Sequence, residues 1–129
     1  MTEKRVLCVD DNKQMCDIVT QLLNPFTVVS ANDIGEALEI AASGKFDLFI
    51  VDIHLPDGVG TDLVSELRKE HPDTPAILIT TAPDLSMEEI RDIGAVSLLD
   101  KVSSTFVSDL LRISGSFLSA SSSPAIYLD

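Results

Sequence analysis

The chain has 129 residues, with 21 acidic and 9 basic side chains that give a formal net charge of −12. Its length and its 45% hydrophobic content predict one folded domain with its own core. The acidic balance argues against direct binding to nucleic acid or to an anionic membrane surface. No apolar run approaches the roughly 20 residues of a membrane span, so we expect a cytoplasmic protein. Cys8 and Cys16 form neither a CxxC pair nor a disulfide framework, and we expect reduced thiols.

The first part of the chain alternates apolar runs with amphipathic stretches. Residues 6–9 are continuously apolar and end at an acid pair, which is typical of a strand buried on both faces of a parallel sheet. Asn12 is placed to cap the helix that follows. Residues 27–29 predict a weaker second strand, and Asn32 or Asp33 is expected to cap the second helix.

The alternation continues through the middle of the chain. Residues 48–51 predict the strongest strand, and a turn rich in proline and glycine follows at residues 55–60. Thr61 is expected to cap the third helix. Residues 76–79 predict a fourth buried strand.

The last part of the chain completes the pattern. Ser86 and Glu89 have the spacing of a capping box and predict the start of a short fourth helix. Residues 96–99 predict the fifth strand, and a final amphipathic helix is expected from about Ser104.

Five strand–helix units in succession predict an α/β fold with a doubly wound, five-stranded parallel sheet. The topology expected is flavodoxin-like, with strand order 2-1-3-4-5 and helices on both faces. We assign residues 1–118 to this domain and residues 119–129 to a serine-rich tail or the start of a linker. In this architecture, function lies outside the carboxyl ends of the strands, where the strand order reverses.

Three carboxylates follow the strands expected at that point. Asp10 and Asp11 come after the first strand, and Asp52 comes after the third. Crowded carboxylates raise one another's pKa unless a cation neutralises them, and Mg²⁺ accepts carboxylate, water and phosphate oxygens as ligands. A carboxylate beside such a cation can also attack phosphorus. The sequence therefore predicts a Mg²⁺ site and an aspartyl phosphate.

Two further side chains at the same edge suit phosphoryl chemistry. Lys101, after the fifth strand, supplies an ammonium that would neutralise charge on the transferring group. Thr80, after the fourth strand, supplies a hydroxyl that could bond to a phosphoryl oxygen. Thr81 is one residue away and offers the same chemical group.

The candidate site residues and several turn residues occur in a characteristic order along the chain: Asp10-Asp11, Asp52 with Leu55-Pro56 and Gly60, Thr80, Gly94-Ala95 and Lys101. Over residues 4–118, this set resembles the receiver domain of two-component response regulators, the CheY-like family. The resemblance implies that Asp52 accepts a phosphoryl group from a phosphohistidine on a sensor histidine kinase or a histidine phosphotransfer domain. It implies that Asp10, Asp11, Asp52 and the backbone carbonyl of His54 bind Mg²⁺, and that Thr80 and Lys101 contact the phosphoryl group.

The resemblance also implies a signalling switch that catalyses only its own phosphorylation and dephosphorylation, not an enzyme with external substrates. An effector domain beyond the tail is one expected partner. A second is another copy of the chain, bound through the face made by the fourth helix, fifth strand and fifth helix.

Four positions depart from the family pattern. Val102 follows Lys101 where similar domains usually have proline, and Leu98 occupies the usual aromatic position. Thr81 replaces a small residue after Thr80. His54 lies two residues after Asp52, where side chains in similar domains tune the attack of water on the phosphate. We therefore expect the common output switch to be altered or absent.

Three alternatives remain at this point. A degenerate receiver acting only as a protein-interaction module is favoured by Leu98 and Val102, and disfavoured by the intact acid set. A haloacid-dehalogenase-like phosphatase would need a second aspartate where the chain has His54. A flavin-binding electron carrier is disfavoured because Asp10 and Asp11 would repel a phosphate after the first strand.

Overall fold

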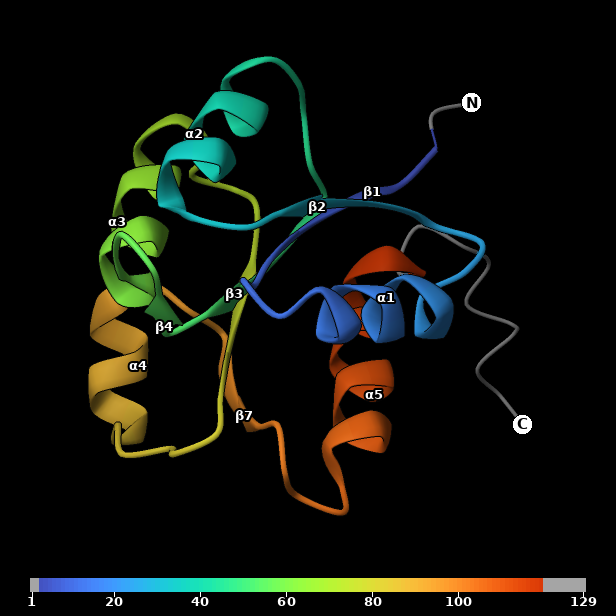
Figure 1. Cartoon of the computed structure of the whole chain (residues 1–129), viewed down its shortest axis with the longest axis vertical. Helices are drawn as coiled ribbons and strands as arrows, with labels where there is room; N and C mark the ends of the chain where they lie inside the picture. Colours follow the sequence, from blue (N-terminus) through green and yellow to red (C-terminus); the bar gives the residue numbers. More distant parts are fainter. Residues whose placement is uncertain (1–2, 120–129) are drawn as a thin grey trace.

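The structure, a computed structural model, describes residues 3–119. A five-stranded parallel sheet of order β2-β1-β3-β6-β7 lies between two layers of helices (Figure 1). Since β6 and β7 are the fourth and fifth strands of this sheet, the predicted order 2-1-3-4-5 is confirmed. The two remaining strands form a small antiparallel hairpin outside the sheet.

Strands and helices alternate along the described residues. In chain order they are β1 (Arg5–Val9), α1 (Lys13–Leu22), β2 (Thr27–Ala31), α2 (Ile34–Ala42), β3 (Leu48–Asp52), β4 (His54–Leu55), β5 (Gly58–Val59), α3 (Gly60–Glu70), β6 (Ala76–Thr80), α4 (Met87–Ile93), β7 (Ser97–Asp100) and α5 (Phe106–Leu118).

The sheet separates the core into two halves. Helices α2, α3 and α4 cover one face, and α1 and α5 cover the other (Figure 1). Strands β3 and β6 are buried at every residue because they occupy the middle of the sheet and have helices on both sides. This explains why their sequences are almost continuously apolar and do not alternate.

Local capping accounts for several helix starts. The Asn12 side chain accepts hydrogen bonds from the N–H groups of Gln14 and Met15, and Asp33 caps α2. Ser86 and Glu89 form the predicted capping box of α4. Each of these caps satisfies backbone N–H groups that the first turn of a helix leaves unpaired.

One predicted cap is wrong. The N-cap of α3 is Val59, which makes no side-chain capping bond, so Thr61 lies inside the helix and does not cap it. The predicted turn is present at Pro56 and Asp57, where it joins β4 to β5, and this hairpin leads directly into α3. A Cβ at Gly60 would clash with the backbone oxygen of Asp52, so only glycine fits where α3 begins, directly beside the end of β3.

The final helix begins at Phe106 and ends at Leu118, slightly later than the predicted start near Ser104. Of the predicted tail, only Ser119 belongs to the described residues, and residues 120–129 lie outside them. Within residues 3–119, no helix has both the length and the apolar character needed to cross a membrane.

Candidate functional site

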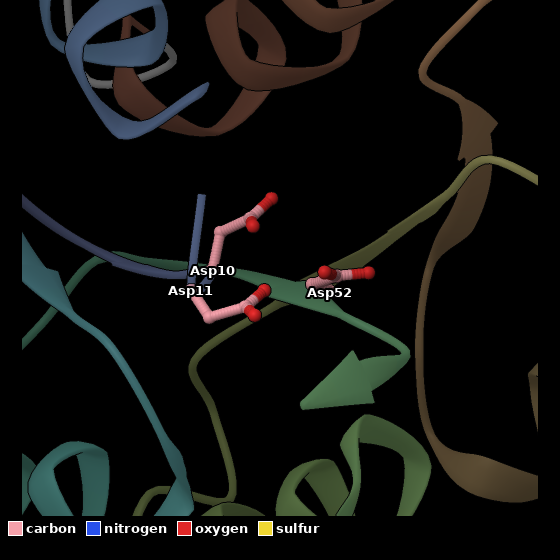
Figure 2. A group of neighbouring side chains, drawn as sticks. All are labelled: Asp10, Asp11 and Asp52. Atoms are coloured by element: carbon pink, nitrogen blue, oxygen red, sulfur yellow. The ribbon is translucent and has the colours of Figure 1, made fainter. Parts of the chain in front are cut away.

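An acidic cluster lies at the carboxyl edge of the sheet. Strand register pairs Val9 of β1 with Val51 of β3, which brings the residues that follow them side by side. One carboxylate oxygen from each of Asp10, Asp11 and Asp52 lies within 4.8 Å of the others (Figure 2). Asp10 is fully buried and Asp52 is 5% exposed, whereas Asp11 is exposed. The three acids that the sequence placed at the switch point therefore do converge.

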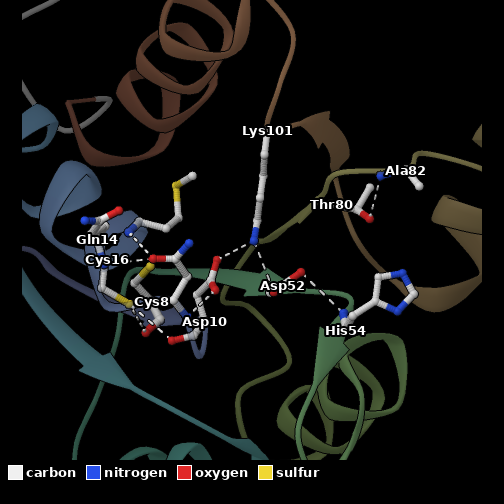
Figure 3. Close-up of polar contacts among 11 residues, drawn as sticks. Cys8, Asp10, Gln14, Cys16, Asp52, His54, Thr80, Ala82 and Lys101 are labelled. Carbon is white, nitrogen blue, oxygen red and sulfur yellow. Dashed lines mark hydrogen bonds and ion pairs between the residues drawn. The ribbon is translucent and has the colours of Figure 1, made fainter.

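Lys101 directly follows β7, the strand at one edge of the sheet, and its side chain reaches this cluster. Its Nζ lies 2.7 Å from Asp10 Oδ2 and 3.1 Å from Asp52 Oδ2 (Figure 3). The lysine side chain is only 10% exposed, and its backbone N–H donates to the Thr80 carbonyl oxygen at 2.8 Å. The ammonium therefore pairs with two buried carboxylates, and the backbone hydrogen bond to Thr80 holds Lys101 in place beside them.

The charges in the cluster perturb one another. Burial raises the pKa of Asp52, and the neighbouring negative charge of Asp10 raises it further, while Lys101 opposes both effects. Burial alone would lower the pKa of Lys101, but hydrogen bonds and charge from Asp10 and Asp52 outweigh it, so the pKa is raised. Three carboxylates face one ammonium, and when all are ionised this leaves an excess of two negative charges that suits a divalent cation.

His54 supports the central carboxylate through its backbone. The His54 N–H donates to Asp52 Oδ1 at 3.3 Å, and the imidazole is exposed (Figure 3). His54 also pairs with Val59 in the β4–β5 hairpin. The predicted role of its backbone carbonyl as a metal ligand stays a prediction.

Thr80 ends β6 and is fully buried. Its Oγ1 accepts a hydrogen bond from the N–H of Ala82 at 3.2 Å (Figure 3). The hydroxyl is thereby used within its own loop as an acceptor, and its proton is free for another acceptor. Thr81, the neighbouring alternative, is exposed.

The structure shows the surroundings of two positions that depart from the family pattern, Val102 and Leu98. Asp100 Oδ1 accepts from the N–H of Val102 at 3.0 Å, and the Asp100 carbonyl accepts from the N–H of Ser103 at 3.1 Å. Asp100 therefore shapes the loop after Lys101, where the family has proline. Leu98 is half-buried and packs against the core under α2, α3 and α4.

The two cysteines are free and buried, as predicted. The Cys16 thiol donates to the Asp10 carbonyl oxygen at 3.5 Å, which links α1 to the end of β1 beside the acid cluster (Figure 3). A hydrogen bond with Cys16 and burial both raise the pKa of Cys8. Cys8 therefore stays a protonated, small apolar residue.

A doubly wound sheet with an acid cluster and a lysine at its switch point is the arrangement expected of the receiver class of signalling domains. The family model for the response regulator receiver domain matches residues 6–107. The chain belongs to this family, which consists of signalling switches of two-component systems. Membership sets aside the phosphatase and the flavin carrier.

Curated relatives support the same assignment. The chain is 33% identical to the response regulator protein PilR of Pseudomonas aeruginosa over 105 residues, which cover 78% of this chain and 23% of PilR. It is 36% identical to the response regulator MprA of Mycobacterium ulcerans over 101 residues, which cover 75% of this chain and 43% of MprA. The chain thus spans less than half the length of these relatives.

Solved structures show the same fold. A CheY-like receiver domain protein from Methanospirillum hungatei superposes with a TM-score of 0.80 at 30% identity, covering 92% of this chain and 96% of that one. The signal receiver domain of an HD domain-containing protein from Pseudomonas fluorescens gives a TM-score of 0.82 at 29% identity, covering 92% and 97%.

Proposed function

We propose that this receiver domain accepts a phosphoryl group on Asp52 from a phosphohistidine of a sensor histidine kinase or histidine phosphotransfer domain. The observation that carries the proposal is the Lys101 ammonium, 3.1 Å from Asp52 and 2.7 Å from Asp10 in a buried acid cluster. An Asp52 oxygen forms the new bond to phosphorus as the phosphorus–nitrogen bond of the donor breaks. The imidazole leaves with the electron pair and takes up a proton.

The other side chains stabilise the charge that develops on the phosphoryl oxygens. Lys101 is already desolvated and oriented, so its ammonium needs little reorganisation to pair with one of these oxygens. Thr80 uses its oxygen to accept from Ala82, which leaves its proton available to donate to another. A raised pKa also makes the Asp52 carboxylate more basic and hence a better nucleophile.

The donor set fits a magnesium ion. Asp10, Asp11, Asp52 and the backbone carbonyl of His54 would hold it, since hard divalent cations prefer carboxylate and carbonyl oxygens. When bound, Mg²⁺ supplies positive charge to the transferring phosphoryl group. The excess of negative charge over the single Lys101 ammonium supports this assignment.

The proposed domain spans residues 1–118, with residues 119–129 as a tail, and acts in the cytoplasm. Its proposed partners are the phosphoryl donor, an effector domain beyond the tail and a second copy of the chain. Support for the second copy comes from exposed apolar side chains on or beside α4, β7 and α5, namely Met87, Val96, Val102, Val107 and Leu111. Leu98 is half-buried against the core and provides no aromatic ring at the usual switch position, so we propose that output runs through the loop after Thr80 and through α4.

Intact-mass spectrometry after incubation with acetyl phosphate and Mg²⁺ tests the phosphoacceptor assignment. We expect the wild type to gain the mass of one phosphoryl group, and Asp52→Ala and the Mg²⁺-free sample to gain none. A folded wild-type protein that gains no mass would favour the degenerate receiver. Undiminished addition in Asp52→Ala would place the acceptor elsewhere.

A further inference from the structure

Asp57 bridges the hairpin beside the site to the start of α2. Its Oδ1 accepts from the N–H of Ile34 at 2.9 Å, and its Oδ2 accepts from the N–H of Gly35 at 3.0 Å. These bonds lower the pKa of Asp57, so its side chain stays ionised at neutral pH. They connect segments 22 and 23 residues apart in the sequence, and an anion at a helix N-terminus is electrostatically favoured.

Asp57 is not the N-cap residue of α2. Asp33 already caps α2, because its side chain accepts from the N–H of Glu36. Asp57 instead comes from another element and takes the two N–H groups that Asp33 does not reach. Its distinctive effect is therefore on the hairpin to which it belongs.

The hairpin is held at both of its ends. At its base, the Gly60 N–H donates to the Ile53 carbonyl oxygen at 2.6 Å, next to the end of β3. At its tip, a Cβ at Gly58 would lie 2.7 Å from Ile34 Cδ1, so the backbone there rests directly against α2. His54 lies between these two attachments, and its N–H donates to Asp52.

We propose that Asp57 is a positioning residue for the acid cluster: by tying the β4–β5 hairpin to α2, it fixes the backbone of His54 beside Asp52. The inference rests on the proposed function only for the metal-binding role of the His54 carbonyl. Asp57 acts through His54 and needs no contact of its own with the metal or with the phosphoryl group.

This tie, formed by the hydrogen bonds of Asp57 to the N–H groups of Ile34 and Gly35, affects the affinity for Mg²⁺. Loss of a residue that orients a metal ligand typically weakens metal binding about 10-fold to 100-fold. We expect Asp57→Ala to raise the Mg²⁺ dissociation constant about tenfold. Phosphorylation by acetyl phosphate at a fixed, subsaturating Mg²⁺ concentration should slow by a similar factor, whereas saturating Mg²⁺ should restore most of the rate.

A second pair of variants removes the tie from the other side. Ile34→Pro deletes one donor N–H while keeping α2, since proline suits the first helical position and Asp33 before it is extended. Ile34→Ala loses the same side chain but retains the N–H. We expect Ile34→Pro to weaken Mg²⁺ binding relative to Ile34→Ala. Asp73 lies in an exposed turn, and Asp73→Ala controls for the loss of one negative charge in Asp57→Ala.

Calorimetric Mg²⁺ titration and hydrogen exchange across residues 53–59 test the positioning role of Asp57 without relying on activity. Weaker binding and faster exchange in both Asp57→Ala and Ile34→Pro support the tie. Equal affinities in Asp57→Ala and the wild type overturn it, as does Ile34→Pro matching Ile34→Ala, or Asp73→Ala matching Asp57→Ala. If the wild type takes no phosphate yet these affinities differ as expected, the proposed function fails while the tie stands.

Discussion

At the scale of single residues, Lys101 is the side chain on which the cluster most depends. Without it, Asp10 and Asp52 would face each other in a buried site with no cation between them. Removing one partner of a buried ion pair commonly destabilises a protein by about 3–5 kcal/mol. Protonation of one carboxylate would reduce this cost, because Asp52 already has a raised pKa.

We therefore predict that Lys101→Met lowers the free energy of unfolding by about 3 kcal/mol in Mg²⁺-free buffer. Added Mg²⁺ should recover part of the loss, since a cation then returns to the cluster. Urea denaturation measures both effects. Lys69→Met is the matched control, because Lys69 pairs with Glu66 at 3.0 Å on the surface and should lose under about 1 kcal/mol. Equal losses in the two variants would mean that Lys101 is not stabilising the cluster.

The raised pKa of Asp52 predicts a specific pH dependence. Native Asp52 binds its proton at a higher pH than the unfolded chain does, where the ordinary value is 3.8. Ionised Asp52 therefore costs stability at neutral pH, and this cost disappears as pH falls through the native pKa toward 3.8. Asp52→Asn should be more stable than the wild type at pH 7, with a gap that narrows on acidification.

Urea denaturation of both proteins between pH 7 and pH 4.5 measures this gap. Asp73→Asn, an exposed position, provides the control and should show no such convergence. A gap between Asp52→Asn and the wild type that stays constant or widens as pH falls would contradict the raised pKa. The comparison isolates the acid cluster, because the acids outside it contribute equally to both proteins.

At the scale of elements, capping signals within one helical turn and the order of the long strands were predictable, whereas contacts made by short irregular segments were not. The capping box at Ser86 and Glu89 was predicted because both partners lie within one turn. Thr61 was wrongly assigned because α3 begins at Gly60, where only glycine fits beside the end of β3. The two-residue strands β4 and β5 carry no periodic pattern, so the hairpin was also missed.

The same reasoning explains which site residues could be found from the sequence. Asp10, Asp52 and Lys101 each lie at the carboxyl end of a strand of the parallel sheet, so the topology alone brings them together. Asp57 and Asp100 act through hydrogen bonds to backbone N–H groups, in one case 22 and 23 residues away. A single acidic side chain in a turn carries no signal that distinguishes such a role from ordinary exposure.

The short helix α4 should be sensitive to its cap. It spans only seven residues, so the capping box and the left-handed Gly94 at its end are a large part of what defines it. We predict that Ser86→Ala costs about 1 kcal/mol and speeds hydrogen exchange within residues 86–94. Ser116→Ala in α5, an exposed position, should change neither quantity in that segment. Unchanged exchange in Ser86→Ala would show that tertiary packing holds α4.

At the scale of the whole molecule, the net charge of −12 has two separate consequences. Dispersed surface acids repel one another, and any salt that screens them stabilises the fold to some extent. The acid cluster is different, because its charges are concentrated in one place and only a cation that binds there relieves them. Monovalent salt and Mg²⁺ should therefore act differently on stability.

We predict that Mg²⁺ raises the melting temperature beyond the effect of NaCl at equal ionic strength, with a mass-action dependence on its concentration. At ten times the dissociation constant, binding contributes about 1.4 kcal/mol. Asp11→Asn should reduce this difference between the salts while leaving the NaCl response intact, since Asp11 is an exposed member of the cluster and neither pairs with Lys101 nor fills the core. Differential scanning calorimetry on both proteins makes the comparison. Identical responses to Mg²⁺ and NaCl in the wild type would mean that the charge acts only through general screening, and that the convergence of Asp10, Asp11 and Asp52 does not create a cation site.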